Sequence, residues 1–211
     1  MSTSGIRFGS WALAICMSLQ SFVVYAGPAD DAKQVIQTTI DEIFSVLKSG
    51  KKSSAERQGL IESIAYARFD LEQMAKLVLA RNYSEVKKQE KLADFTQEFK
   101  KHLGLTYGRR LDAYSDEQVQ VGESREESNK DVSVKTKIVG GNADGVIIEY
   151  RLRQLGGEWR VIDVIIEGLS LIANFRSQVD SIITDKKNGG IDKLIEKLRQ
   201  KNGEKATQPV S

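Results

Sequence analysis

Residues 159–179 read WRVIDVIIEGLSLIANFRSQV, and they predict a buried strand that leads directly into an amphipathic helix. Between Val161 and Ile166, only Asp163 interrupts a run of branched apolar side chains. A strand with one face in water would alternate apolar and polar residues, so this run predicts a strand covered on both faces. After Gly168, apolar residues follow at helical spacing. The rest of the chain must therefore supply cover for both faces of one strand.

The composition is that of an ordinary globular protein. Of the 211 residues, 40% are hydrophobic and 28% are charged, and 31 Lys and Arg against 29 Asp and Glu give a formal net charge of +2. Proteins that bind nucleic acid usually carry a strong basic excess, which argues against that class of partner here. The length supports one domain, or one domain with a helical extension, which is predicted over residues 27–201.

Residues 1–26 predict a secretory signal peptide. Arg7 precedes an apolar run over residues 11–24, which is too short to span a bilayer comfortably and is typical of a signal-peptide core. Ala26 is a small residue that suits the cleavage position, so the mature chain is expected to begin at Gly27. The alternative is a retained membrane anchor.

Cys16 is the only cysteine, and it lies inside the predicted signal peptide. The surrounding Leu13-Ala14-Ile15-Cys16 is similar to a lipoprotein signal, but Ile15 is bulky where a small residue is needed. The mature chain would have no cysteine, and therefore neither a disulfide nor thiol chemistry in an oxidising compartment.

Helical spacing of apolar residues dominates the first half of the mature chain. Helices are predicted with Asp30 in the first turn of one and with Ser54, Asp70 and Ser84 as the N-caps of three others, the last running toward Tyr114. Asp70 gives the best start signal, because it is a good N-cap residue with a glutamine at capping-box spacing.

Alternation of apolar and polar residues replaces helical spacing after residue 115. Strands are predicted around residues 119–121, at 131–138 and at 146–153, and the buried strand that contains residues 161–166 is the fourth. Short glycine-rich turns between them predict an antiparallel meander of about four strands. A short helix over residues 191–198 and a disordered tail over residues 202–211 complete an α+β fold, with helices before and after a curved sheet.

Few residues offer catalytic chemistry. His102 is the only histidine, and its lysine neighbours predict a solvated position on the long helix. With one histidine and no mature cysteine, neither a Cys–His pair nor a zinc cluster is expected. No glycine-rich phosphate loop is followed by Lys-Ser or Lys-Thr. We therefore predict no catalytic residue, no metal site and no cofactor.

Asp163 is the one residue that invites an enzymatic interpretation. A carboxylate in a strand covered on both faces would act as a general base, with Tyr150 or Tyr107 as its acid–base partner. In the competing structural interpretation, Asp163 pairs with Arg160 or Arg176, or it caps a backbone amide. We expect the structural role.

Two blocks of the sequence resemble the MlaC/toluene-tolerance family. The first block is Phe69-Asp70-Leu71-Glu72-Gln73-Met74 with Val78-Leu79-Ala80-Arg81-Asn82-Tyr83. The second comprises Tyr150-Arg151-Leu152, Trp159-Arg160-Val161, Asp163-Val164, Ile166-Glu167-Gly168-Leu169-Ser170-Leu171, Asn174-Phe175-Arg176-Ser177-Gln178 and Gly189-Gly190-Ile191-Asp192. The likeness keeps the family's order across nearly all of residues 30–200. Ala80 stands for the family's usual glycine and Tyr83 for its tryptophan, which affects only local packing.

The resemblance implies a periplasmic protein that carries phospholipids between the outer and inner membranes of Gram-negative bacteria and so maintains outer-membrane lipid asymmetry. It implies two partners, an outer-membrane lipoprotein complex and an inner-membrane ABC transporter with an MCE-domain subunit. It also implies an NTF2-like sheet packed with a helical subdomain around an apolar pocket for acyl chains. The alternatives are an NTF2-like enzyme acting on a small apolar substrate and a periplasmic interaction module without a ligand.

The candidate lipid contacts are apolar residues on the predicted helices and the last two strands. They are Met74, Val78, Phe95, Phe99, Leu103, Tyr107, Leu111, Tyr150, Val164, Ile166, Leu169, Ile172 and Phe175.

Overall fold

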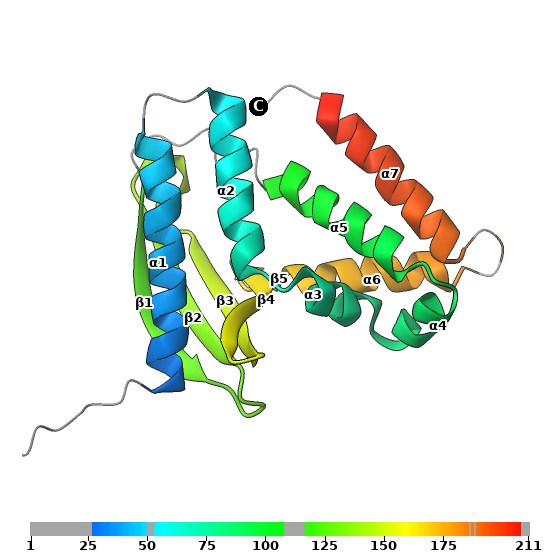
Figure 1. The fold of residues 1–211 in the computed structure, drawn as a ribbon, viewed down its shortest axis with the longest axis horizontal. Helices are drawn as coiled ribbons and strands as arrows, with labels where there is room; N and C mark the ends of the chain where they lie inside the picture. The colour runs from blue at the N-terminus through cyan, green and yellow to red at the C-terminus, as the bar shows by residue number, and fades with distance from the viewer. Residues whose placement is uncertain (1–26, 50–52, 108–116, 186, 188, 208–211) are drawn as a thin grey trace, which may run out of the picture.

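The computed structural model describes residues 27–49, 53–107, 117–185, 187 and 189–207 (Figure 1). The predicted signal peptide with Cys16, and the predicted helix end with Leu111 and Tyr114, lie outside these residues. Among the described residues, no helix combines the length and the apolar character that crossing a membrane requires.

The fold is α+β, and it combines a curved antiparallel sheet with two groups of helices. The helices are α1 (Pro28–Lys48), α2 (Ser54–Arg68), α3 (Leu71–Leu79), α4 (Tyr83–Lys88), α5 (Leu92–Tyr107), α6 (Leu171–Ile183) and α7 (Ile191–Thr207), with short 3-10 turns η1 (Ala80–Asn82) and η3 (Gly141–Ala143). The strands are β1 (Gln118–Glu126), β2 (Val132–Val139), β3 (Ile147–Leu155), β4 (Glu158–Ile166) and β5 (Leu169–Ser170). They pair in chain order, and the two-residue β5 adds one strand to the meander of about four that the sequence predicts.

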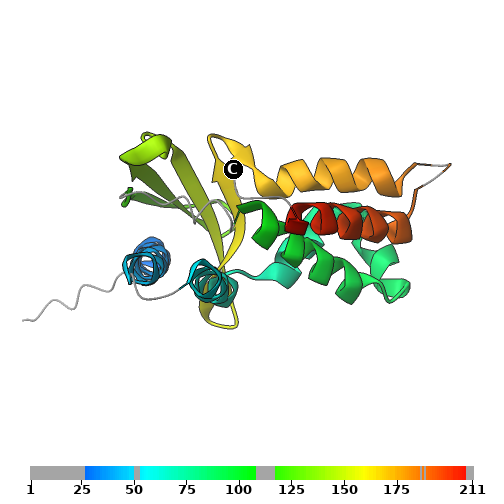
Figure 2. The same cartoon turned by 90° about the horizontal axis from the view of Figure 1, so that it is seen from above.

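Helices α1 and α2 lie side by side on one face of the sheet, while α3 to α7 form a helical subdomain beside it (Figures 1 and 2). Ile36 and Ile40 of α1 pack against Val132, Val134 and Leu152 of the sheet. This arrangement makes one two-layer core under α1, which we call the sheet core. A second core, the helical core, gathers apolar residues of α3 to α7.

Strand β4 is covered on both faces over residues 161–164, because all four residues are buried. The predicted run extends to Ile166, but Ile165 and Ile166 are only half-buried. The pairing of β3 with β4 shifts register between Arg151 and Leu152, which leaves Ile162 as the extra residue. Val161 pairs with Leu152 on the face toward α1, whereas Asp163 pairs with Arg151 on the opposite face.

The helix starts follow the capping chemistry. The Asp70 carboxylate accepts a hydrogen bond from the Gln73 backbone N–H at 2.7 Å, as predicted. The prediction that Ser54 caps α2 is wrong by one residue. Ser53 is the cap, and the Glu56 carboxylate accepts the Ser53 backbone N–H at 2.8 Å in a capping box.

The prediction of one long helix from Ser84 toward Tyr114 is wrong, because the described part of this segment forms two helices, α4 and α5. Helix α4 ends at Lys88, and Glu90 takes a left-handed backbone conformation with φ of 57° before α5 begins. This turn lets Val86 and Phe95 face the same helical core.

Two predictions about the surface are also wrong. His102 is buried rather than solvated, with its Nδ1 2.9 Å from Oδ1 of Asn202 and its ring edge-on to Phe175. The predicted tail begins at this Asn202, but α7 continues to Thr207 and Asn202 is fully buried. The amide of Asn202 donates to the Glu98 carbonyl at 3.1 Å, so this residue joins α7 to α5.

Candidate functional site

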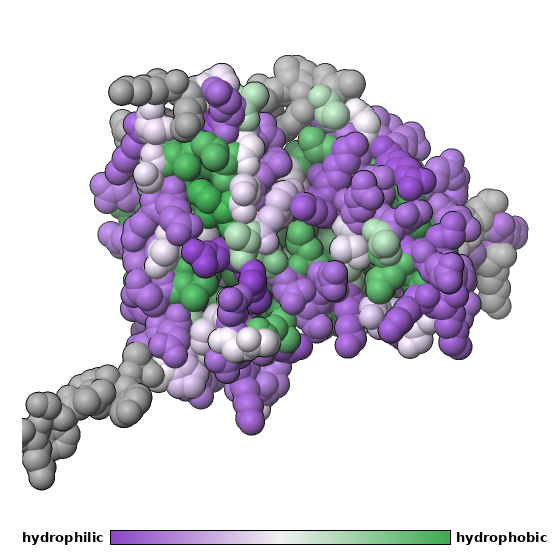
Figure 3. Space-filling model, in the orientation of Figure 1, coloured by the Kyte–Doolittle hydropathy of each residue, from purple (hydrophilic) through white to green (hydrophobic). Residues whose placement is uncertain are grey.

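An apolar cavity of about 320 Å³ lies at the boundary between the sheet core and the helical subdomain. Its walls come from α1, α2, the start of α3, the end of α5, strands β3 and β4, and the first residue of α6. Hydrophobic atoms gather between α1 and α2 on the face that Figure 3 shows. The lining residues are Ile36, Thr39, Ile40, Ile43, Ile61, Glu62, Ala65, Tyr66, Arg68, Phe69, Leu71, Met74, Leu103, Gly104, Tyr107, Ile148, Tyr150, Val161, Val164, Ile166 and Leu171.

The sheet wall of the cavity follows from strand pairing. Ile148 pairs with Ile166 and Tyr150 with Val164, so alternate residues of two neighbouring strands point to the same side. Burial raises the pKa of the Tyr150 phenol, while its hydrogen bond with Thr136 acts in the opposite direction. This wall therefore presents aliphatic groups and an uncharged phenol.

The helical wall depends on a close approach of α2 to α5. A Cβ at Gly104 would lie 2.7 Å from the Tyr66 hydroxyl, so a side chain there would displace the tyrosine. The Lys100 ammonium lies 4.0 Å from the centroid of the Tyr66 ring. Burial, with a smaller contribution from Glu62, raises the pKa of Tyr66.

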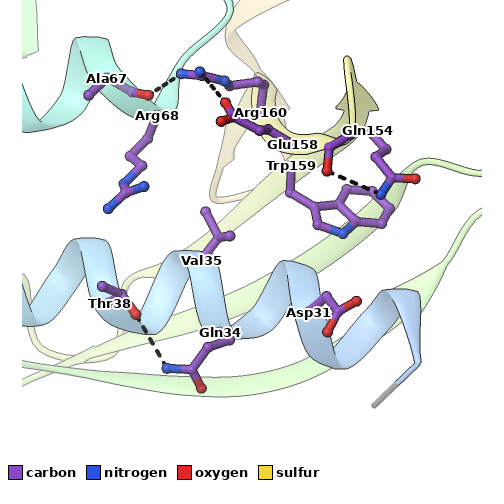
Figure 4. Close-up of a pocket in the computed structure, with 11 residues that line it drawn as sticks. Asp31, Gln34, Val35, Thr38, Ala67, Arg68, Gln154, Glu158, Trp159 and Arg160 are labelled. Atoms are coloured by element: carbon purple, nitrogen blue, oxygen red, sulfur yellow. Dashed lines mark hydrogen bonds and ion pairs between the residues drawn. The ribbon is translucent and has the colours of Figure 1, made fainter. Parts of the chain in front are cut away.

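A second, polar cleft of about 570 Å³ adjoins the first cavity (Figure 4). It lies between the first half of α1, the end of α2 and the β3–β4 hairpin. Arg160 crosses its edge, donating to the Ala67 carbonyl and to the Glu158 carboxylate. Arg68 lines both the cleft and the apolar cavity.

The structure places the predicted lipid contacts in different surroundings, and Met74 and Leu103 both line the cavity and pack with the helical core. The six that line the apolar cavity are Met74, Leu103, Tyr107, Tyr150, Val164 and Ile166. The five that pack in or against the helical core without lining the cavity are Val78, Phe95, Phe99, Ile172 and Phe175. Leu169 is 70% exposed, and Leu111 lies outside the described residues. The helical-core residues share the apolar spacing of the wall residues, so spacing alone did not separate them.

Sequence reasoning missed the contribution of α1 and α2 to the cavity. Ile36, Ile40 and Ile43 form an apolar stripe along α1, and Ile61 and Ala65 do so on α2. That spacing was a signal for a buried face but not for a face that borders empty space. Arg68 carried no sequence signal as a wall residue.

Asp163 is engaged within the chain. Its carboxylate accepts hydrogen bonds from the Ser170 hydroxyl at 2.6 Å and from the Ile172 backbone N–H at 3.1 Å, at the start of α6. Of the structural roles predicted for Asp163, the one observed is therefore the capping of a backbone amide. Arg160 and Arg176 hydrogen-bond elsewhere, Arg176 to the Leu77 carbonyl at 3.0 Å.

Known proteins resemble this chain over most of its length. A toluene tolerance protein, ttg2D, from Pseudomonas putida is 27% identical over 183 residues, which cover 84% of each chain. The intermembrane phospholipid transport system binding protein MlaC from Haemophilus influenzae is 23% identical, with 97% of each chain covered.

The fold also matches a solved structure. The phospholipid-binding protein from Ralstonia solanacearum, solved in complex with a phospholipid, superposes with a TM-score of 0.72 at 22% identity. The match covers 84% of this chain and 99% of that one. The sequence model of the family described as "MlaC protein" matches residues 37–200, and the chain therefore belongs to the MlaC family.

Proposed function

We propose that this protein is a periplasmic phospholipid carrier, which shuttles lipids between the outer and inner membranes and so maintains outer-membrane lipid asymmetry. The observation that carries the proposal is the apolar cavity, whose walls are aliphatic and aromatic with few polar groups. Its relatives in Haemophilus influenzae and Ralstonia solanacearum are named for phospholipid transport and phospholipid binding, which supports the same ligand class here.

Acyl-chain burial gives the carrier its purpose. Moving apolar chains out of water is favourable by about 0.8 kcal/mol per CH₂ group. Two chains of about 14 methylenes each would gain on the order of 20 kcal/mol before entropic losses. A free lipid therefore leaves a membrane very slowly, and a protein with an enclosed apolar site removes that barrier. The direction of transport would come from partners.

The location and partners belong to the same proposal. The apolar run over residues 11–24 and the small Ala26 support export with cleavage before Gly27. The partners would be an outer-membrane lipoprotein complex and an inner-membrane ABC transporter with an MCE-domain subunit. The intact mass of protein isolated from the periplasm tests whether the signal peptide is cleaved before Gly27. A retained N-terminus or an acyl group on Cys16 would contradict it.

No observation favours the enzyme alternative as a second function. Asp163 is absent from the cavity lining and hydrogen-bonds Ser170 and Ile172. Tyr107 and Tyr150 do line the cavity, but the strand register directs Asp163 to the face opposite Tyr150 and Val164.

The decisive experiment is organic extraction of the purified periplasmic protein, followed by mass spectrometry. Phospholipid is expected in the extract of the native protein. Val164→Trp should lower the amount, because the indole would enter the cavity that Val164 lines. The matched control is Lys135→Trp, which adds the same side chain at an exposed position of β2. Native protein without phospholipid would refute the carrier proposal, and equal loss in both variants would refute the assigned pocket.

A further inference from the structure

Arg68 lies at the junction of the apolar cavity and the polar cleft. It is the last residue of α2, and its side chain forms part of the lining of both spaces. About a third of the side chain is exposed (34%), so its guanidinium is neither sealed in the core nor free in solvent. A cation at such a junction faces hydrocarbon on one side and water on the other.

The guanidinium of Arg68 has unused hydrogen-bonding capacity. Its Nη2 donates to the Glu42 carboxylate at 3.2 Å, and Glu42 is itself 43% exposed. Its Nε is buried and has no hydrogen-bond partner within the described part of the chain. A buried donor without an acceptor is unfavourable, and an oxyanion that binds the guanidinium fork would remove that penalty.

The polar cleft is electrically asymmetric. Arg68 lies at one end, while Asp31 and the Trp159 ring lie at the other (Figure 4). The remaining charged pair of the cleft, Arg160 with Glu158, is joined within the hairpin. The open ends therefore offer a cation on one side and a carboxylate beside an aromatic ring on the other.

Resting on the function proposed above, we propose that the polar cleft binds the headgroup of a zwitterionic phospholipid whose acyl chains occupy the apolar cavity. The Arg68 guanidinium binds the phosphodiester in place of Glu42, which is exposed enough to be hydrated when released. Asp31 and the Trp159 ring bind the headgroup ammonium by charge and by cation–π attraction.

The test measures headgroup preference rather than lipid binding alone. Protein stripped of lipid is incubated with vesicles that contain phosphatidylethanolamine and diacylglycerol with identical acyl chains, and the captured lipids are quantified by mass spectrometry. The native protein should favour phosphatidylethanolamine. Arg68→Gln should lower that ratio about tenfold, since hydrogen bonds to a charged group are lost. Arg125→Gln, which breaks the Arg125–Glu127 pair at the end of β1, should leave the ratio unchanged.

A second comparison isolates the ammonium. With vesicles of phosphatidylethanolamine and phosphatidylglycerol, the native protein should favour phosphatidylethanolamine, and Asp31→Asn should reduce that preference. An unchanged preference in Asp31→Asn would overturn the assignment of the ammonium end.

The outcomes separate this inference from the proposed function. If the native protein captures neither lipid, the carrier function fails and the inference fails with it. If both lipids are captured and Arg68→Gln keeps the native ratio, only the headgroup inference is refuted. Phosphorus NMR with inorganic phosphate distinguishes a site for a lipid headgroup from a site for free phosphate. Phosphate binding that Arg68→Gln abolishes without changing the lipid ratio would show a site for free phosphate, contrary to the proposal.

Discussion

The helical core and the sheet core are built from similar apolar stripes but fill space differently. In the helical core, Phe95 stacks on Phe99 at 5.9 Å between ring centroids, and Phe175 meets Phe99 edge-on at 5.2 Å. In the sheet core, aliphatic side chains of α1 face the strands and border a cavity of about 320 Å³. Rings from α5 and α6 pack directly against one another in the helical core, whereas the apolar side chains of the sheet core border empty space. Apolar character and helical spacing alone therefore do not distinguish a wall from a core.

The largest effect is expected from truncating the centre of the closed core. Phe99→Ala should lower the free energy of unfolding by about 3–5 kcal/mol, because it removes a fully buried ring and leaves a void. Urea denaturation followed by circular dichroism measures this change. Ile43→Ala, which enlarges a space that already exists, is the comparison variant. An equal cost for both would show that the two cores are packed alike.

The next effect concerns the residue that links the two regions. Asp163→Ala should destabilise the protein by about 2–3 kcal/mol, since the buried Ile172 amide and the Ser170 hydroxyl lose their acceptor. Asp163→Asn retains one acceptor oxygen and should cost less. Melting temperatures of the lipid-free variants provide the measurement, and an unchanged value for Asp163→Ala would contradict the structural role.

A smaller effect separates overpacking in the two cores. Val78→Trp should cost about 1–3 kcal/mol, because Val78 is fully buried in the helical core. Val164→Trp in lipid-free protein should cost less, since its side chain borders the cavity. Calorimetry on both variants, with and without lipid, tests the comparison. The two costs should converge when lipid is bound, and convergence in the lipid-free state would place Val164 in a filled core.

The smallest effect is a pH dependence confined to the helical core. Burial, opposed by the Asn202 hydrogen bond and reinforced by Lys205 and Lys201, lowers the pKa of His102. Below pH of about 6.5, the histidine of the unfolded chain binds a proton more readily than His102 of the folded chain does. The free energy of unfolding is therefore highest above this pH and decreases as the pH falls below it. His102→Gln should flatten the melting temperature between about pH 7 and pH 5. An identical slope in the variant would assign the effect to other groups.

Sequence reasoning succeeded where local chemistry decides the outcome. The cap at Asp70, the strand buried on both faces and the antiparallel order of the strands follow from capping, alternation and short turns. It missed two local features, the Ser53 cap and the turn at Glu90, and it misjudged burial where the deciding contact lies far away in the chain. The lysine neighbours of His102 predict a solvent-exposed side chain. In the structure it is buried against Asn202 of α7, which lies 100 residues later in the sequence.

The candidate site was predictable only in part for the same reason. Strand pairing places Tyr150, Val164 and Ile166 on one wall, and their alternation is visible in the sequence. Whether a helix stripe meets another stripe or an empty space depends on the angle and distance between elements, which spacing does not encode. Phe95 and Leu103 lie on the same helix and both contact the helical core, but of the two only Leu103 also lines the cavity.

The pairing of the first and last helices with distant partners has a consequence for how the chain folds in time. Helix α1 meets strands that follow it by about a hundred residues, and α5 is closed by α7 through Asn202. Contacts between such distant segments make folding slow, because the intervening chain must be ordered before they form. The helical core cannot be completed until α7 is present, because Ile191, Leu194, Ile195 and Leu198 belong to it. A chain that stops before α7 would lack the element that shields His102, so the last helix sets the moment at which the native state becomes accessible.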